Sequence, residues 1–282
     1  MTILITGLPR SGTSLTASLV SSAGYKCSIG KSILGSSDLN RNGYFEDIDF
    51  ILFNDQLIRF FYGNKFSFLF PPQKQHFKEL KNFNNGWKYD IDDNTLDIPD
   101  KYLDEIELYS DLGWDVWGLT RMQNGGKWNK CYSRRLIHQK SDLLIKLKFY
   151  KNKINQIKSD FFLKDPRLVF TLDLIADPKI TKVIILSRKP EANTNSIRRH
   201  YGKRIFTNNP YPRKEWVSNH FNMKVGYMAE KNYYQAYEDY IEAIQNKFNT
   251  LKLSFEKILE KGEEIDKLES FVCAKVNRDL IN

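Results

Sequence analysis

Four short strand-like segments divide the chain, three apolar runs at residues 3–6, 161–164 and 182–187 and an alternating stretch at 250–253. Each run has the length of a buried strand and is followed by apolar positions at helical spacing. Parallel strands need crossover connections, most often helices, between them. The pattern therefore predicts an α/β fold in which a central parallel β-sheet is covered by helices on both faces.

The remaining helical patterns are looser. Helical spacing of apolar residues predicts further helices within the ranges 47–62, 99–112, 136–158 and 213–247. We interpret the whole chain, 1–282, as a single domain with a helical and loop insertion at about 63–158.

The insertion is rich in turn-forming residues and in tryptophan. Its loop-like stretches, 82–98 and 113–133, contain the four tryptophans Trp87, Trp114, Trp117 and Trp128. Two interpretations stay open. The tryptophans anchor a small satellite core, which we rank first, or their faces shape a pocket for an acceptor molecule such as a sugar.

The first strand runs into a glycine-rich loop. From Gly7 to Ser14 the chain has the frame of the nucleotide-binding loop G-x-x-x-x-G-K-[ST], but Thr13 stands where the lysine belongs and Arg10 lies inside the loop. A helical pattern starts at once, so the loop amides and the helix N-terminus would favour an anion. The alternative is an ordinary strand-turn-helix connection in which the serines serve as caps.

A second basic motif follows the strand at 182–187. Arg188 stands at the carboxyl end of that strand, Pro190 fits the first turn of a helix, and Ser196 comes eight residues after Arg188. An arginine at this edge of a parallel sheet lies where such folds bind ligands. The first loop and this motif would thus share one crevice.

Together the two motifs resemble the sulfotransferases that use 3′-phosphoadenosine 5′-phosphosulfate, in their bacterial or viral cytosolic form. The resemblance covers 1–62 and 159–282, including Phe255-Glu256 after the last strand, and implies a P-loop NTPase-like sulfotransferase fold. It also implies transfer of a sulfuryl group to an acceptor hydroxyl, which leaves adenosine 3′,5′-bisphosphate. Carried over to this chain, it assigns the 3′-phosphate to Arg188 and Ser196, and the 5′-phosphosulfate to Pro9, Arg10, Ser11, Gly12, Thr13 and Ser14.

The resemblance also suggests catalytic residues. Arg10 would neutralise the charge that grows on the departing 5′-phosphate. No histidine follows Lys164, where cytosolic members of the family carry their catalytic base, so a carboxylate must take that role. Glu46, in Gly-Tyr-Phe-Glu after the first helix, is the first choice and Asp165 the second. The alternative for Glu46 is capping of the following helix.

Composition limits the ligands, cofactors and cellular compartment that we expect. Forty-three Lys and Arg against 34 Asp and Glu give a net charge of +9, which suits an anionic donor, while the scattered lysines show no nucleic-acid signature. The three cysteines are not spaced for a metal, so we expect a reduced compartment and no metal cofactor. With no room for a signal peptide before the first strand and no apolar run of membrane-spanning length, we expect a cytoplasmic enzyme without membrane or nucleic-acid partners.

The acceptor expected from this setting is a hydroxylated molecule such as a carbohydrate or a small metabolite. Two other functions stay open. One is a non-catalytic nucleotide-binding relative that has lost turnover, and the other is a P-loop kinase. The kinase is disfavoured because position 13 lacks a lysine and the strand at 182–187 ends in Ser-Arg rather than in an acidic magnesium ligand.

Overall fold

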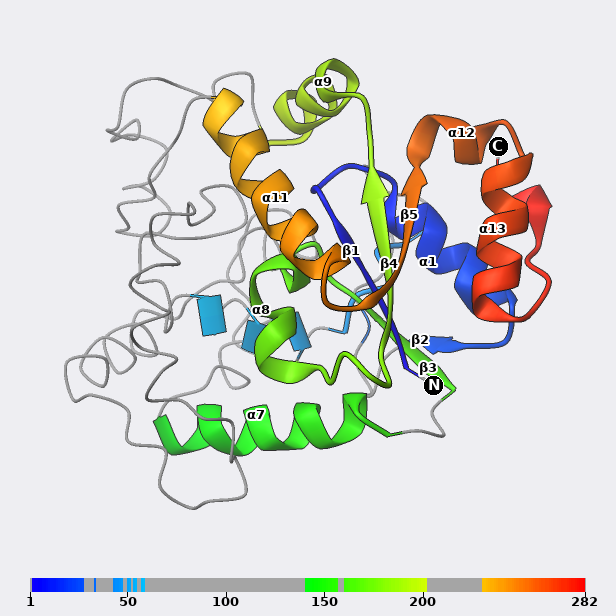
Figure 1. The fold of residues 1–282 in the computed structure, drawn as a ribbon. Helices are drawn as coiled ribbons and strands as arrows, with labels where there is room; N and C mark the ends of the chain where they lie inside the picture. Colours follow the sequence, from blue (N-terminus) through cyan, green and yellow to red (C-terminus); the bar gives the residue numbers. More distant parts are fainter. Residues whose placement is uncertain are drawn as a thin grey trace. The chain divides into compact units, whose positions relative to one another are not determined.

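A sheet of five parallel strands forms the centre of the computed structural model (Figure 1). The structure describes residues 2–27, 33, 43–47, 50–51, 53–54, 57–58, 140–156, 160–201 and 230–281. The strand order is β2-β3-β1-β4-β5. The strands are β1 (Ile3–Gly7), β2 (Lys26–Cys27), β3 (Phe161–Lys164), β4 (Lys182–Ser187) and β5 (Asn249–Ser254). The predicted parallel sheet flanked by helices is confirmed.

Four of the strands are those that the sequence predicts, and β2 is an addition. It pairs in parallel with β3, Lys26 opposite Phe161 and Cys27 opposite Phe162. β2 consists of two residues, one of them a lysine, so the sequence contains no apolar run that would predict this strand. β2 is held by its position at the edge of the sheet, where the Lys26 amide also donates to the carbonyl of Asp160 at 2.8 Å.

Helices follow the strands as parallel connections require. The helix bounds are α1 (Thr13–Ser22), α7 (Lys140–Ile154), α8 (Leu168–Ile175), α9 (Pro190–Tyr201), α11 (Glu230–Gln245), α12 (Phe255–Leu259) and α13 (Glu263–Val272), with a short 3₁₀ helix η2 (Arg278–Leu280). Of the looser helical patterns, α7 lies within 136–158 and α11 within 213–247, whereas 99–112 lies outside the described residues. In the range 47–62, the described positions from Phe50 onward are helical and buried.

The chain divides into two compact units. The first consists of Met1–Ile51, Lys151–Ile205 and Tyr237–Asn282 and contains the whole sheet, while the second consists of Leu52–Tyr150 and Phe206–Ala236. The predicted insertion, 63–158, falls mostly in the second unit, and its tryptophans lie outside the described residues. Within the second unit the rings of Phe53 and Tyr150 stack with centroids 4.8 Å apart.

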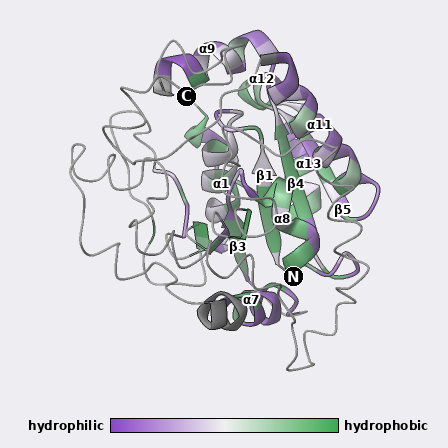
Figure 2. Cartoon of the chain, turned by 90° about the vertical axis from the view of Figure 1, so that its left-hand side faces the viewer, coloured by the Kyte–Doolittle hydropathy of each residue, from purple (hydrophilic) through white to green (hydrophobic). Residues whose placement is uncertain are grey.

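The two faces of the sheet in the first unit are covered by different helices. Ile3 and Ile5 pack with side chains of α1, α12 and α13 on one face, and α8 lies on the other side of the sheet (Figure 1). There the ring of Phe170 meets Tyr237 and Tyr240 of α11 edge-on, at 5.0 and 4.9 Å between centroids. Figure 2 shows β1, β4 and α8 as hydrophobic, whereas α9 is largely hydrophilic. The central strands β1, β3 and β4 therefore supply the core, as their continuous apolar runs predict.

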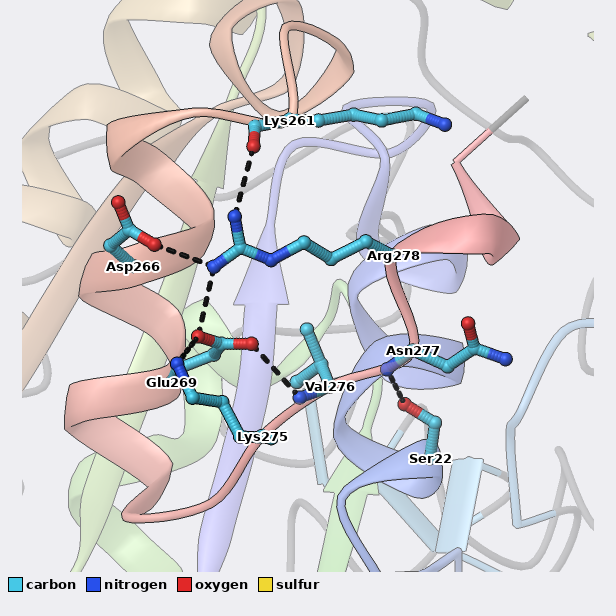
Figure 3. Close-up of polar contacts among 8 residues, drawn as sticks. All are labelled: Ser22, Lys261, Asp266, Glu269, Lys275, Val276, Asn277 and Arg278. Carbon is cyan, nitrogen blue, oxygen red and sulfur yellow. Dashed lines mark hydrogen bonds and ion pairs between the residues drawn. The ribbon is translucent and has the colours of Figure 1, made fainter.

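A cluster of charges fastens the C-terminal segment to α13 (Figure 3). Glu269 accepts from the amide of Val276 at 3.2 Å and forms ion pairs with Lys275 at 2.7 Å and Arg278 at 2.9 Å. Arg278 also reaches Asp266 and the carbonyl of Lys261. The hydrogen bonds from Lys275 and Arg278 lower the pKa of Glu269 to about 2. We call Glu269, Lys275 and Arg278 the C-terminal clasp.

None of the described helices combines the length and the apolar character needed to cross a membrane.

Candidate anion site at the carboxyl end of the sheet

The loop after β1 is shaped from within. Gly7 has a φ of 134°, and a Cβ at this position would stand 2.2 Å from the carbonyl oxygen of Leu186, so only glycine lets β1 turn this close to β4. The hydroxyl of Ser11 is buried and donates to the carbonyl of Leu8 at 2.6 Å. This hydrogen bond closes the loop within itself. It uses the Ser11 hydroxyl that the sequence predicts to bind the 5′-phosphosulfate.

The loop ends at the N-terminus of α1. Gly12, with a φ of 93°, is the N-cap residue, and Thr13 and Ser14 form the first turn of the helix. A glycine cap has no side chain to accept from the first amides, which suits a helix N-terminus that receives an anion. Thr13 is buried and Ser14 is half-buried.

Arg10 has a left-handed backbone, with a φ of 65°. This conformation is unfavourable for a residue with a side chain, and such residues are concentrated at functional sites. Two contacts hold it in place. Arg188 donates from Nη1 to the Arg10 carbonyl at 3.0 Å, and Arg10 Nε donates to the Ser196 hydroxyl at 3.4 Å.

The structure thus brings together the two basic motifs predicted to hold the donor. The loop after β1 and the start of α9 meet a third time where Asn193 donates from Nδ2 to the Pro9 carbonyl at 2.8 Å. Asn193 is buried, and the sequence analysis assigned it no role. Asn193 is the fourth residue of α9 and its side chain faces the loop, but an asparagine in a helix carries no signal of such a contact.

The two predicted ends of the donor site are in direct contact. Arg10 is predicted to bind the 5′ end and Ser196 the 3′-phosphate, yet their side chains touch. Arg188 contacts the backbone of Arg10 and Ser196 contacts its side chain, so the two motifs lie next to each other.

Glu46 lies beside the end of β3, paired with a buried lysine. Its carboxylate accepts a short hydrogen bond from Nζ of Lys164, and the two side chains are 11 % and 3 % exposed. In a buried pair each charge depends on the other for compensation. Lys164 is the functional candidate that the sequence analysis left without a role, although its position as the last residue of a buried strand could have indicated one.

The alternative role of Glu46, helix capping, is taken by its neighbour. Asp47 accepts from the amide of Phe50 at 3.1 Å with its side chain, and its carbonyl accepts from the amide of Ile51 at 2.9 Å. This is the geometry of an N-cap residue. With Asp47 as the cap, the Glu46 carboxylate is directed to Lys164 instead.

Asp165, the second candidate base, is hydrogen-bonded to Arg167. Its Oδ1 accepts from the backbone amide of Arg167 at 2.9 Å and from Nη1 of the same residue at 3.0 Å, and Asp165 is fully buried. Asp165 and Arg167 therefore form a buried ion pair. Its amide also donates to Ile5 at 3.1 Å, which extends the pairing of β3 with β1.

A thiol lies close to the charged pair. Burial, followed by the negative charge of Asp47, raises the pKa of Cys27 to about 12, although Lys164 acts in the opposite direction. Cys27 pairs with Phe162 in the sheet, two residues before Lys164 on β3. The thiol stays protonated there at neutral pH.

Arg10, Asp165 and Arg188 follow the carboxyl ends of β1, β3 and β4, which lie at the same edge of the sheet because the strands are parallel. In the parts of the chain that the structure describes, no three His, Cys, Asp or Glu side chains gather closely enough to hold a metal ion.

No protein-family model matches this chain, and no curated protein matches it either. The functional interpretation therefore depends on the site's own residues.

Proposed function

We propose that the protein is a sulfotransferase that moves a sulfuryl group from 3′-phosphoadenosine 5′-phosphosulfate to an acceptor hydroxyl. The observation that carries this proposal is the contact of Arg10 with Ser196 and Arg188 at the N-terminus of α1. Two arginines, a hydroxyl and uncapped helix amides suit a ligand with several phosphate groups. In a nucleoside triphosphate site, a lysine in the loop supplies the positive charge. This chain has no lysine there, and Arg10 supplies the charge instead.

In the proposed donor complex, the loop amides, Thr13 and Ser14 hold the 5′-phosphosulfate. Arg188 and Ser196 hold the 3′-phosphate. Arginine suits both positions because its planar donors match phosphate oxygens and its charge persists at every physiological pH. The net charge of +9 adds a general attraction for such a donor.

The proposed transfer is a direct displacement. A new bond forms between the acceptor oxygen and sulfur while the bond from sulfur to the bridging phosphate oxygen breaks. Arg10 and the loop amides stabilise the negative charge that collects on the departing 5′-phosphate. The Lys164 ammonium is placed at the same sheet edge, where it can offset charge on the sulfuryl oxygens.

Glu46 is the proposed general base that accepts the proton of the acceptor hydroxyl. Asp165 is the weaker candidate because its carboxylate accepts from the amide and the guanidinium group of Arg167, which orders the turn after β3. The acceptor is proposed to be a hydroxylated carbohydrate or small metabolite.

Turnover tests this proposal. Purified protein is incubated with donor labelled in the sulfuryl group and a panel of sugars, phenols and small alcohols, and labelled products are separated from the donor. Labelled product that appears with at least one acceptor, and is lost in Arg10→Ala, supports the proposal. Failure of every acceptor in protein that binds the bisphosphate would favour a binding protein without catalysis.

A further inference from the structure

Phe255, the first residue of α12, joins the two basic motifs of the candidate site. Its ring lies under the guanidinium group of Arg188, with 4.5 Å between Cζ and the ring centroid. The same ring covers Gly12, where a Cβ would meet ring carbon Cδ2 at 2.2 Å. One aromatic ring thus touches the loop after β1 and the arginine after β4.

Glu256, the next residue, fixes the turn that carries Arg188. Its Oε1 accepts from the amide of Lys189 at 3.1 Å, and its Oε2 accepts from the hydroxyl of Ser254 at 3.1 Å. Burial opposes ionisation of this carboxyl, but hydrogen bonds from its own amide, from Lys189 and from Ser254, with the charge of Arg188, hold the pKa of Glu256 below its ordinary value. The side chain and the backbone at Arg188 are therefore restrained from the same short segment.

We propose that Phe255 and Glu256 form a positioning brace that orders Arg188 for the 3′-phosphate of the donor before the donor binds. Phe255 acts on the guanidinium group and Glu256 on the turn that follows it. The inference deepens the proposed function and depends on it. It makes Phe255 a residue that acts through Arg188, without contact to the ligand.

The physical reason is the conformational freedom of arginine. A free arginine side chain has many rotamers, and a ligand that must immobilise it binds more weakly. A guanidinium group held against an aromatic face has already lost that freedom. Arg188 also donates to the Arg10 carbonyl. The brace therefore holds the strained loop and the Arg188 side chain in fixed positions relative to each other.

Gly12 belongs to the same arrangement. A side chain at position 12 would push the ring of Phe255 away from its place under Arg188. The glycine therefore serves both the left-handed backbone of the loop and the close approach of the ring.

The test compares two ligands that differ in the 3′-phosphate alone. Dissociation constants for adenosine 3′,5′-bisphosphate and adenosine 5′-phosphate are measured by calorimetry on the full chain. In Phe255→Leu the preference for the bisphosphate should fall by about 2- to 10-fold, the cost of ordering one long side chain. Phe255→Tyr, which keeps the aromatic face, should retain the preference of the wild type.

Phe271 supplies a matched control within the first unit. Lys182 lies over its ring at 5.0 Å, and Lys182 begins the same strand that ends before Arg188. Phe271→Leu removes a ring and a cation contact of the same kind from the opposite end of β4. It should lower thermal stability and leave the ligand preference unchanged.

If Phe255→Leu does not fold, trifluorophenylalanine incorporated at position 255 keeps the shape of the ring and weakens its attraction for a cation. The preference for the bisphosphate should then fall as well. An unchanged preference in either variant, or an equal loss for both ligands, overturns the brace while the proposed function stands. A wild-type protein that shows no preference for the bisphosphate overturns the proposed function and the brace with it.

Discussion

At the residue scale, the pairing of Glu46 with Lys164 joins the proposed general base to a buried charge that affects stability. The two charges come from segments 118 residues apart, and both side chains are almost fully buried. Removal of one charge leaves the other buried without compensation, whereas removal of both does not. Their effects on folding must therefore be separated from their effects on turnover.

Lys164→Met should destabilise the protein by about 3–5 kcal/mol, because Glu46 is left as an unpaired buried charge. The double variant Lys164→Met, Glu46→Gln should recover a large part of that loss. Urea denaturation measures both. The exposed pair of Lys247 with Asp173, at 49 % and 42 % exposure, gives the control, since Lys247→Met should cost less than about 1 kcal/mol. Equal losses at positions 164 and 247 would contradict the burial of the pair.

Glu46→Gln should reduce single-turnover rates by about 10²- to 10⁴-fold with donor affinity nearly unchanged. The amide oxygen of glutamine can still accept from Lys164, but the lysine loses its opposite charge, so the rates are compared at a temperature where the melting curve shows the variant folded. Asp165→Asn should affect the transfer step less, because Asp165 already accepts from Arg167. An active Glu46→Gln together with a folded, donor-binding but inactive Asp165→Asn would reverse the two roles.

Cys27 reports on the same neighbourhood. With its pKa raised to about 12, the thiol should react with iodoacetamide at pH 8 at least about 100-fold more slowly than a thiol of ordinary pKa. Cys273 is exposed and serves as the internal comparison. Mass spectrometry of the alkylated peptides measures each site in the intact protein. Equal labelling of the two cysteines would contradict the raised pKa of Cys27.

At the element scale, the C-terminal clasp should make stability depend on pH. The pKa of Glu269 in the folded protein, about 2, lies below the ordinary value of 4.5. The stabilisation is therefore complete above about pH 5 and is lost as the pH falls from about 4.5 toward 2. Glu269→Gln should melt at a lower temperature than wild type at pH 7, and the two should converge near pH 2.

Exposed Glu260 provides a control for the clasp, because Glu260→Gln removes the same charge from a nearby position. Its melting temperature should follow that of the wild type at each pH. A difference between wild type and Glu269→Gln that persists unchanged down to pH 2 would show that the carboxylate charge is not what holds the segment.

The elements also show how far the sequence could predict this fold. The strands at 3–6, 161–164 and 182–187 could be predicted because burial on both faces demands continuous apolar runs, and the edge strand at 250–253 because its leucines alternate with polar residues. β2 could not, because it is short, lies at the sheet edge and includes Lys26. Pairing along the edge decides its conformation, and such pairing is invisible in local sequence.

The site shows the same division. Arg10, Arg188 and Ser196 could be predicted to lie together because each follows a strand of one parallel sheet. The partners of the charged groups could not. Whether Glu46 caps a helix or meets Lys164 depends on which of two adjacent acidic residues, Glu46 or Asp47, faces the helix amides, and a turn with Phe45 at a φ of 53° decides it.

At the scale of the whole molecule, the sheet unit contains every group proposed to bind the donor. Its segments are separated in sequence by the second unit. The basic charge of the chain would draw many anions, so binding of an anion alone is weak support for the proposed function. The discriminating property is the preference for a nucleotide with phosphates at both the 3′ and the 5′ positions.

Thermal melting with nucleotides tests the central claim most directly. At a concentration 100 times its dissociation constant, adenosine 3′,5′-bisphosphate should stabilise the protein by about 2.7 kcal/mol, with ATP at the same concentration far less effective and no response in Arg188→Ala. Stabilisation by ATP equal to that by the bisphosphate, or a full response in Arg188→Ala, would contradict the proposed donor site.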